Sequence, residues 1–359
     1  MALMTVPVID VAAFLSGDAE SKRKLAAEVN RACEDIGFWI MTGHGIEREL
    51  CNELFRVNQE FFDLPVAEKL KCRIDTSRQR VVSFSSRRGY LPVASEAFSY
   101  SRLVHSPGDL RESFSLGPID VPTDSYFHTE TAQPHFAPNL WPERPAELKT
   151  LCLEYYRRMS RLSEVVARIF ALALGLEENY FEDRMDKHTS ALLIHHYPDQ
   201  PDEPLPDQLR TGAHSDLGMF TILRTEDEHR PGGLEVRNRA GAWVEVPAIR
   251  NSFVMNIGDM MMRWTNDRWI STMHRVLNPP RARAVGNHRM SAPFFYYPNY
   301  DTVVECLPNC SSAGNPPKYP PVACGDYRME RISRVMNFAR SRGAAVDETR
   351  PSAASSTER

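Results

Sequence analysis

Residues 211–225 read TGAHSDLGMFTILRT, an apolar, β-branched stretch that carries a histidine and an aspartate two positions apart. The composition is typical of a buried strand, and side chains two apart on a strand point to the same face. We therefore predict that His214 and Asp216 lie side by side on a buried face. Two polar groups are costly there unless something pairs them. A divalent metal would pair them, and so would a simple hydrogen bond.

The surrounding sequence predicts a β-rich core. Short alternating or apolar runs recur at close intervals and are separated by glycine, proline and asparagine turns. This spacing favours a sandwich or a closed barrel. The runs span 191–197, 213–224, 233–237, 242–246, 252–257, 269–277 and 289–297.

Helices are predicted on both sides of this core. Helices fit 20–35, 48–63 and 326–340, and the apolar positions of 145–174 follow the helical period. Short strands fit 6–11 and 37–46, whereas residues 76–145 are irregular and predict long loops over a surface or a mouth. We divide the chain into a helical and strand region at 1–145 and a core with its C-terminal helix at 146–342. Residues 343–359 have almost nothing to bury and are predicted to be a disordered tail.

Composition excludes several classes of protein. The 359 residues carry 47 acidic and 43 basic side chains, and no basic block is present, which argues against a nucleic-acid partner. The N-terminus lacks a basic leader and a cleavage site, and no apolar run approaches the ~18 residues of a membrane span.

The seven cysteines form no Cys-x-x-Cys pair. We expect free thiols in a cytoplasmic protein, with a metal shared by Cys306 and Cys310 as the alternative.

A metal at His214 and Asp216 needs a third protein ligand, and His274 in STMHRVLNPP is the best candidate. It lies on a different predicted strand of the same β unit. Two imidazoles and one carboxylate on one face are typical of non-haem Fe(II) oxygenases, which keep positions open for co-substrates. The alternative is zinc, which prefers a tetrahedral site.

A second unusual strand, HRMSAPFFYYP, places Arg289 and Ser291 two residues apart and so on one face. A buried guanidinium requires an anionic partner, and the arginine fork binds a carboxylate through two hydrogen bonds. Either a ligand carboxylate or an internal salt bridge would satisfy it.

The run FVMNIGDMMMRWTNDRWISTMHRVLNPP, followed by RMSAPFFYYPN, resembles the signature of the isopenicillin N synthase-like, 2-oxoglutarate/Fe(II)-dependent dioxygenases. PVIDVAAF, CEDIGFWIMTGHGI, DLRESFSLG and HHYPDQP resemble further landmarks of that family, so the similarity spans about residues 5–340. The resemblance implies an α+β fold with a mainly β core, a double-stranded β-helix or jelly-roll barrel with flanking helices at both ends of the chain.

The resemblance also assigns site residues. His214, Asp216 and His274 match the iron ligands, and Arg289 and Ser291 match the pair that grips the far carboxylate of 2-oxoglutarate. Tyr197 matches a tyrosine that supports the same carboxylate. Many members have Asn-Tyr-Tyr-Pro where this chain has His195-His196-Tyr197-Pro198. His195 is therefore either a substitute donor for the other carboxylate or a plain core histidine.

We accordingly expect a dioxygenase that uses Fe(II), 2-oxoglutarate and O2. It would oxidise an unactivated C–H bond of a small molecule of the natural-product kind by hydroxylation, desaturation or cyclisation, with release of succinate and CO2. The alternatives are a same-fold oxidase that does not use 2-oxoglutarate, an ethylene-forming type, and a non-catalytic jelly-roll protein that binds an acid.

The segment SFSSRRGYLP, residues 83–92, occupies a position where family members fold a loop over the mouth of the site. Arg88 and Tyr90 are predicted to touch the substrate or to gate its entry, with the C-terminal helix around Met336 and Phe338 on the other side. The alternative is a solvated surface loop.

Overall fold

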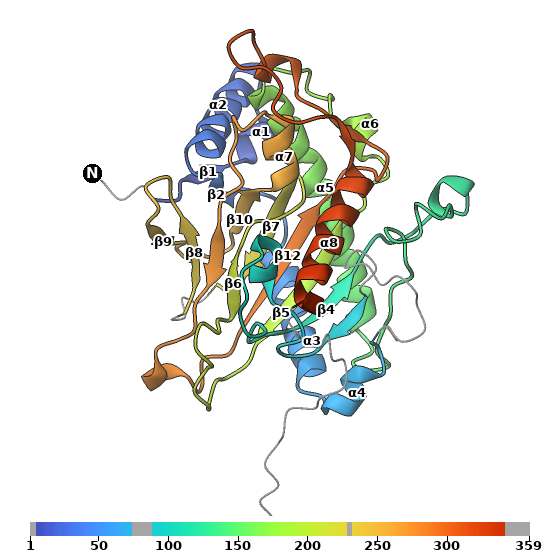
Figure 1. The fold of residues 1–359 in the computed structure, drawn as a ribbon, viewed down its shortest axis with the longest axis vertical. Coiled ribbons are helices and arrows are strands. Elements are labelled where there is room, and N and C mark those ends of the chain that lie inside the picture. The colour runs from blue at the N-terminus through green and yellow to red at the C-terminus, as the bar shows by residue number, and fades with distance from the viewer. Residues whose placement is uncertain (1–4, 74–87, 228–231, 342–359) are drawn as a thin grey trace, which may run out of the picture.

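Two β-sheets form the centre of the protein in the computed structural model, which describes residues 5–73, 88–227 and 232–341 (Figure 1). The larger sheet has eight strands and the smaller sheet has four. The larger sheet runs in the order β1 (Val8–Asp10), β2 (Phe38–Thr42), β10 (Phe253–Ile257), β7 (Phe220–Thr225), β12 (Arg289–Tyr296), β5 (Ala191–Tyr197), β4 (Glu112–Leu116) and β3 (Gly89–Leu91). The smaller sheet runs β6 (Thr211–His214), β11 (His274–Val276), β8 (Leu234–Arg237) and β9 (Trp243–Glu245).

Strands from both ends of the larger sheet belong to the N-terminal part of the chain. β2 pairs antiparallel with β10 at one end, and β4 pairs antiparallel with β5 at the other. The regions before and after residue 145 therefore share one sheet, and one large core includes side chains from both. The jelly-roll barrel that the sequence predicts is confirmed, with its N-terminal region built into the barrel wall.

Alternation along the strands gives the larger sheet two different faces. On β5, Leu192 and Ile194 pack into the large core, whereas Leu193 and His195 line cavities between the two sheets. β12 repeats the pattern, because Met290 and Ala292 face the core while Arg289 and Ser291 face inward. Polar residues at alternate positions therefore mark the interior of the barrel.

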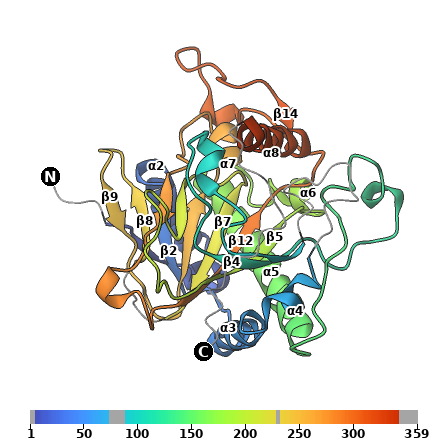
Figure 2. The ribbon, with the colours of Figure 1, turned by 60° about the horizontal axis from the view of Figure 1, so that its bottom comes forward.

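Helices cover the outer face of the larger sheet. Figure 2 shows α3 and α5 on one side of this sheet and α8 on the other. The long amphipathic helix α5 packs against both α2 and α3, and this packing buries its apolar face. The helices are α1 (Ala12–Ser16), α2 (Ala19–Asp35), α3 (Arg48–Phe62), α4 (Val66–Leu70), α5 (Leu148–Ala173), α6 (Glu182–Met185), α7 (Asp259–Trp264) and α8 (Cys324–Ser341).

Two sequence predictions need correction. The strand expected over 213–224 is two strands, β6 and β7, and the chain between them turns through residues 215–219. The stretch 76–145 is not all loop, since it contributes β3, β4 and the 3-10 helix η2 (Phe98–Arg102). The tail predicted at 343–359 lies outside the described residues.

All seven cysteines are free thiols, and six of them are buried, as the sequence predicts. Every helix in the described ranges is too short or too polar to cross a membrane.

Candidate active site

Two histidines and an aspartate converge inside the barrel. His214 ends β6, His274 begins β11, and the two residues are direct partners in the smaller sheet. Asp216 follows in the turn after β6, and its Oδ1 atom lies 3.6 Å from Nε2 of His214 and 3.7 Å from Nε2 of His274. All three residues are buried, and their ligand atoms lie within 4.8 Å of one another. Among the described residues, no other group of three such side chains has this geometry.

The backbone orients both imidazoles. Nδ1 of His214 donates to the carbonyl of Gly212 at 2.8 Å, and Nδ1 of His274 donates to the carbonyl of Thr272 at 3.1 Å. A ring whose Nδ1 carries the proton presents the lone pair of Nε2. Burial and the neighbouring His274 lower the pKa of His214, which favours the neutral ring that a metal ligand requires.

The carboxylate of Asp216 is held by its second oxygen. Oδ2 accepts hydrogen bonds from Oγ1 of Thr221 at 2.5 Å and from Nδ2 of Asn256 at 2.7 Å. Burial by itself raises the pKa of Asp216, but the two imidazoles and these hydrogen bonds outweigh it, and the net pKa is lowered. Oδ1 is left facing both Nε2 atoms, which is the arrangement that a divalent metal requires.

A first cavity, here called the inner cavity, lies between the sheets on one side of these ligands. It receives three of the residues assigned from the sequence, Arg289, Ser291 and Tyr197, and His195 as well. The Arg289 guanidinium lies 5.4 Å from the centre of the Tyr197 ring and donates to the carbonyl of Gly232 at 3.3 Å. The other residues around this cavity include Thr211, Leu223, Asn256 and Val276.

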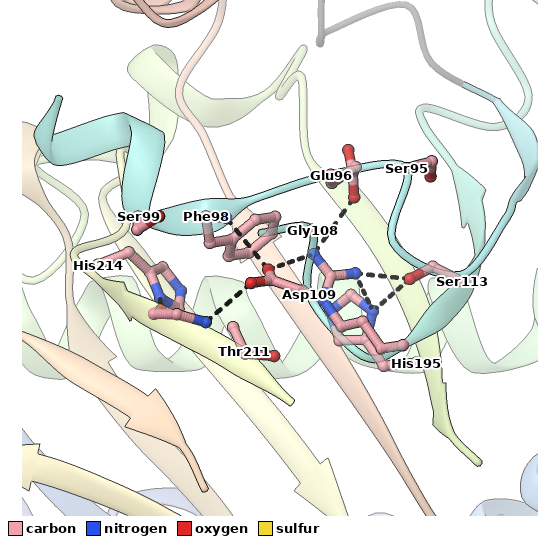
Figure 3. Close-up of polar contacts among 12 residues, drawn as sticks. Ser95, Glu96, Phe98, Ser99, Gly108, Asp109, Ser113, His195, Thr211 and His214 are labelled. Carbon is pink, nitrogen blue, oxygen red and sulfur yellow. Dashed lines mark hydrogen bonds and ion pairs between the residues drawn. The ribbon is translucent and has the colours of Figure 1, made fainter. Parts of the chain in front are cut away.

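His195 has a defined tautomer, because its neighbours fix which ring nitrogen carries the proton (Figure 3). Nδ1 lies 3.0 Å from Nη1 of Arg111 and 2.7 Å from Oγ of Ser113. A guanidinium has only donors, so Nδ1 accepts and the proton is on Nε2. Burial and the charge of Arg111 hold the pKa of His195 well below its usual range. The ring is therefore a neutral donor at the wall of the inner cavity, while the adjacent His196 faces the helices and bonds to Glu112.

The same network ties the strand of His214 to the N-terminal region. One carboxylate oxygen of Asp109 accepts from the backbone N–H of Gly212 at 3.0 Å, and the other accepts from the N–H of Phe98 at 3.1 Å (Figure 3). Arg111 forms an ion pair with Glu96 at 3.2 Å and stacks over the ring of Phe98. These contacts fix the strand whose Gly212 carbonyl orients His214.

A second cavity, here called the outer cavity, opens on the other side of the metal ligands. It encloses about 960 Å³, its open mouth included, and most of its wall is apolar. Its residues include Leu91, Phe98, Leu193, Leu217, Phe295, Tyr297, Ile332 and Val335, together with Arg88 and Arg328. α8 forms part of this wall, and Phe338 at its end contacts Tyr100 of η2.

Of the two residues proposed for substrate contact, only Arg88 reaches the outer cavity. Tyr90 is buried on the opposite face of β3, where its hydroxyl donates to Glu112 at 2.7 Å and its ring packs against Phe61. Alternation predicts the same face for both residues, but Gly89 between them has φ +75°, which breaks the strand pattern. The surface-loop alternative is also wrong for both, since each is only 2% exposed. The rest of that predicted loop, residues 83–87, lies outside the described residues.

Several supporting residues escaped the sequence analysis. Thr221 and Asn256 hold Asp216, and Asp109 holds the strand of His214. Arg111 contacts His195, and Arg328 lines the outer cavity. A signal for Arg111 is present in DLRESFSLG, where the polar residues Arg111, Ser113 and Ser115 are two apart as on one face of a strand, with the apolar Leu110, Phe114 and Leu116 on the other face. No local pattern marks the others.

Comparisons with known proteins agree with this geometry. Residues 6–144 match the family described as non-haem dioxygenase in morphine synthesis N-terminal, and residues 188–298 match the 2OG-Fe(II) oxygenase superfamily. The chain is 34% identical over 331 residues to the 2-oxoglutarate-Fe(II) type oxidoreductase hxnY of Emericella nidulans, covering 91% of this chain and 89% of that protein. It is 31% identical to homoarginine-6-hydroxylase 2-ODD-233 of Oryza sativa subsp. japonica, covering 93% and 97%.

The fold has a close counterpart among solved structures. A full-length Neurospora crassa protein, crystallised in complex with alpha-KG, superimposes with a TM-score of 0.77 at 28% identity, covering 91% of this chain and 96% of that one. The chain thus belongs to the 2OG-Fe(II) oxygenase superfamily, and its His-x-Asp and distal histidine are the facial triad of a non-haem Fe(II)- and 2-oxoglutarate-dependent dioxygenase.

Proposed function

We propose that this enzyme oxidises an unactivated C–H bond of a small molecule bound in the outer cavity, with 2-oxoglutarate bound in the inner cavity. The observation that carries the proposal is the place where the two cavities meet. Phe98, His214, Asp216 and Phe295 line both of them. A metal held by the triad would therefore have the co-substrate on one side and the substrate on the other.

In the inner cavity, Arg289 and Ser291 would hold the far carboxylate of 2-oxoglutarate. Both side chains face inward from β12, and the guanidinium fork with one hydroxyl suits a carboxylate. Tyr197 supports this end, because its ring packs under the guanidinium and its hydroxyl lies 3.3 Å from Oγ1 of Thr211. His195 would donate from Nε2 to the carboxylate nearer the metal.

His195 thus takes the place of the asparagine that many family members carry. The proposal is supported by the acceptor role of Nδ1 toward Arg111, which leaves a proton on Nε2. It is also supported by the lowered pKa of His195, since a neutral ring keeps this single donor over the working pH range.

Bound Fe(II) and 2-oxoglutarate would supply the oxidising chemistry, in which O2, 2-oxoglutarate and the substrate C–H give hydroxylated product, succinate and CO2. The protein's contribution is geometric. His214, Asp216 and His274 would hold the metal from one side, and the apolar wall of the outer cavity would exclude water from the reacting carbon. Hydroxylation is the default outcome, and desaturation or cyclisation follows where the substrate carbon is placed differently.

The test is a measurement of succinate. Purified protein with Fe(II), ascorbate, O2 and 2-oxoglutarate should form succinate slowly alone and faster when an extract containing the substrate is added. Arg289→Gln should remove 2-oxoglutarate binding and both rates, whereas Arg23→Gln, on the exposed side of α2, should leave them unchanged. Wild-type protein that oxidises a substrate without consuming 2-oxoglutarate would instead identify the same-fold oxidase.

A further inference from the structure

Two buried guanidiniums share the wall of the outer cavity. Arg88 precedes β3 and is 2% exposed, while Arg328 lies in the second turn of α8 and is 6% exposed. The two residues are 240 positions apart in sequence, and both line the same cavity as His214 and Asp216. Guanidiniums are rarely buried unless an anion or several carbonyls compensate them.

Arg88 is seated in a slot shaped for it. Its Nη2 donates to the carbonyl of His135 at 3.2 Å, and the guanidinium lies directly over Gly117. A Cβ atom on Gly117 would stand 2.0 Å from that Nη2, so a side chain at position 117 would displace the guanidinium from this place. The slot fixes the guanidinium at the cavity wall.

Arg328 is fixed by different contacts. Nη1 donates to the carbonyl of Thr189 at 3.1 Å, and the guanidinium stacks 4.0 Å from the centre of the Tyr297 ring. In the ranges that the structure describes, no carboxylate lies within ion-pair distance of this side chain. Its known partners are a carbonyl and an aromatic face, and neither cancels its charge.

The two charges act on the same small region. Burial and the charge of Arg328 lower the pKa of Arg88 to about 9, and burial with both arginines lowers the pKa of His135 to about 3. Two acidic residues line the outer cavity, and each has another role. Glu96 forms an ion pair with Arg111, and Asp216 belongs to the triad. Arg328 therefore adds a positive charge, without a carboxylate partner among the described residues, to a cavity that is otherwise mostly apolar.

We propose that Arg88 and Arg328 form an anion subsite for the substrate, which is a small molecule with an apolar body and a carboxylate. The inference rests on the proposed function, since it names the class of substrate for the same cavity. The carboxylate would receive hydrogen bonds from one or both guanidiniums, and the apolar wall would cover the remaining atoms. Anchoring one end leaves a carbon of the body facing the triad.

The test measures binding and does not depend on turnover. Protein loaded with Mn(II) and 2-oxoglutarate without O2 is titrated calorimetrically with phenylacetate, phenylpropanoate and phenylbutanoate, and with the corresponding neutral primary amides. We expect at least one acid to bind roughly tenfold or more tightly than its amide, as a charge-assisted contact requires. Arg328→Gln and Arg88→Gln should each reduce this preference below about threefold.

Arg334→Gln is the matched control, because Arg334 lies on the same helix but is exposed to solvent. It should keep the wild-type preference. Thermal unfolding and 2-oxoglutarate affinity show whether each variant is folded. If Arg328→Gln is unstable, Arg328→Lys takes its place in the test. This variant keeps the charge but loses the fork, and it should retain part of the preference for acids.

The outcomes separate the two ideas. Wild-type protein that fails to bind 2-oxoglutarate would overturn the proposed function. Protein that binds 2-oxoglutarate but binds acids and amides equally, or binds no acid, would overturn the anion subsite alone. The subsite is also wrong if Arg328→Gln keeps the full preference for acids.

Discussion

The hydrogen bond from Thr221 to Asp216 allows a quantitative test of the metal site. Oγ1 of Thr221 donates at 2.5 Å to the carboxylate oxygen that faces away from the two histidines, and both residues are buried. Thr221→Val replaces the hydroxyl by a methyl group of similar size. The ligand atoms stay in place, but one of the two donors that orient the carboxylate is lost.

The expected loss follows from the character of this bond. A hydrogen bond to a charged group contributes about 1.5–3 kcal/mol, which corresponds to roughly 10–100-fold in an equilibrium constant. Asn256 still donates to the same oxygen at 2.7 Å, so we expect the lower end, about tenfold weaker binding of Fe(II). At saturating Fe(II), turnover should recover most of its wild-type value, because all three ligands remain.

The assay is anaerobic competition for Fe(II) against a chelator of known affinity, followed by the rate of succinate formation at rising Fe(II). Thr302→Val is the control, since the Thr302 hydroxyl donates to the carbonyl of Arg184 and this bond involves no residue of the triad. It should cost about 1 kcal/mol of unfolding free energy and leave Fe(II) affinity unchanged. The reasoning is refuted if Thr221→Val binds Fe(II) within twofold of wild type.

Three further predictions concern other parts of the protein. His195→Asn should retain most of the 2-oxoglutarate affinity whereas His195→Leu should lose roughly tenfold or more, measured by calorimetry with Mn(II); equal losses would mean that His195 is structural. Tyr90→Phe should lower the unfolding free energy by about 1–2 kcal/mol without changing the substrate KM, because its hydroxyl bonds to Glu112 away from the cavity. Burial lowers the pKa of His188 to about 4, below its unfolded value, so the unfolded state binds more protons and stability falls as pH drops from about 6.5 to 4. In denaturant titrations, His188→Phe should flatten this decline by up to about 1.4 kcal/mol per pH unit, and an unchanged slope would show that His188 is not desolvated.

Local pattern alone determined much of this protein. The repeat of apolar residues, every second position in strands and about every 3.6 positions in helices, predicted most of these elements within a few residues. Burial of one face produces this repeat regardless of which part of the protein covers that face. The same alternation predicted that Arg289 and Ser291 share a face. Residue type and strand position made His214, Asp216 and His274 candidates for metal ligands, and the family resemblance identified them as iron ligands.

Only the tertiary structure decided how these groups meet. Asp216 reaches the histidines from a turn and not from a strand, and Gly89 turns Tyr90 away from the cavity that Arg88 enters. Alternation predicts that His195 and His196 face opposite ways. Which of them faces the barrel interior depends on which face of the sheet the helices cover. Arg328 joins Arg88 from the other end of the chain. Such pairings depend on long-range packing, where residues far apart in sequence become neighbours, and no periodicity within either segment encodes them.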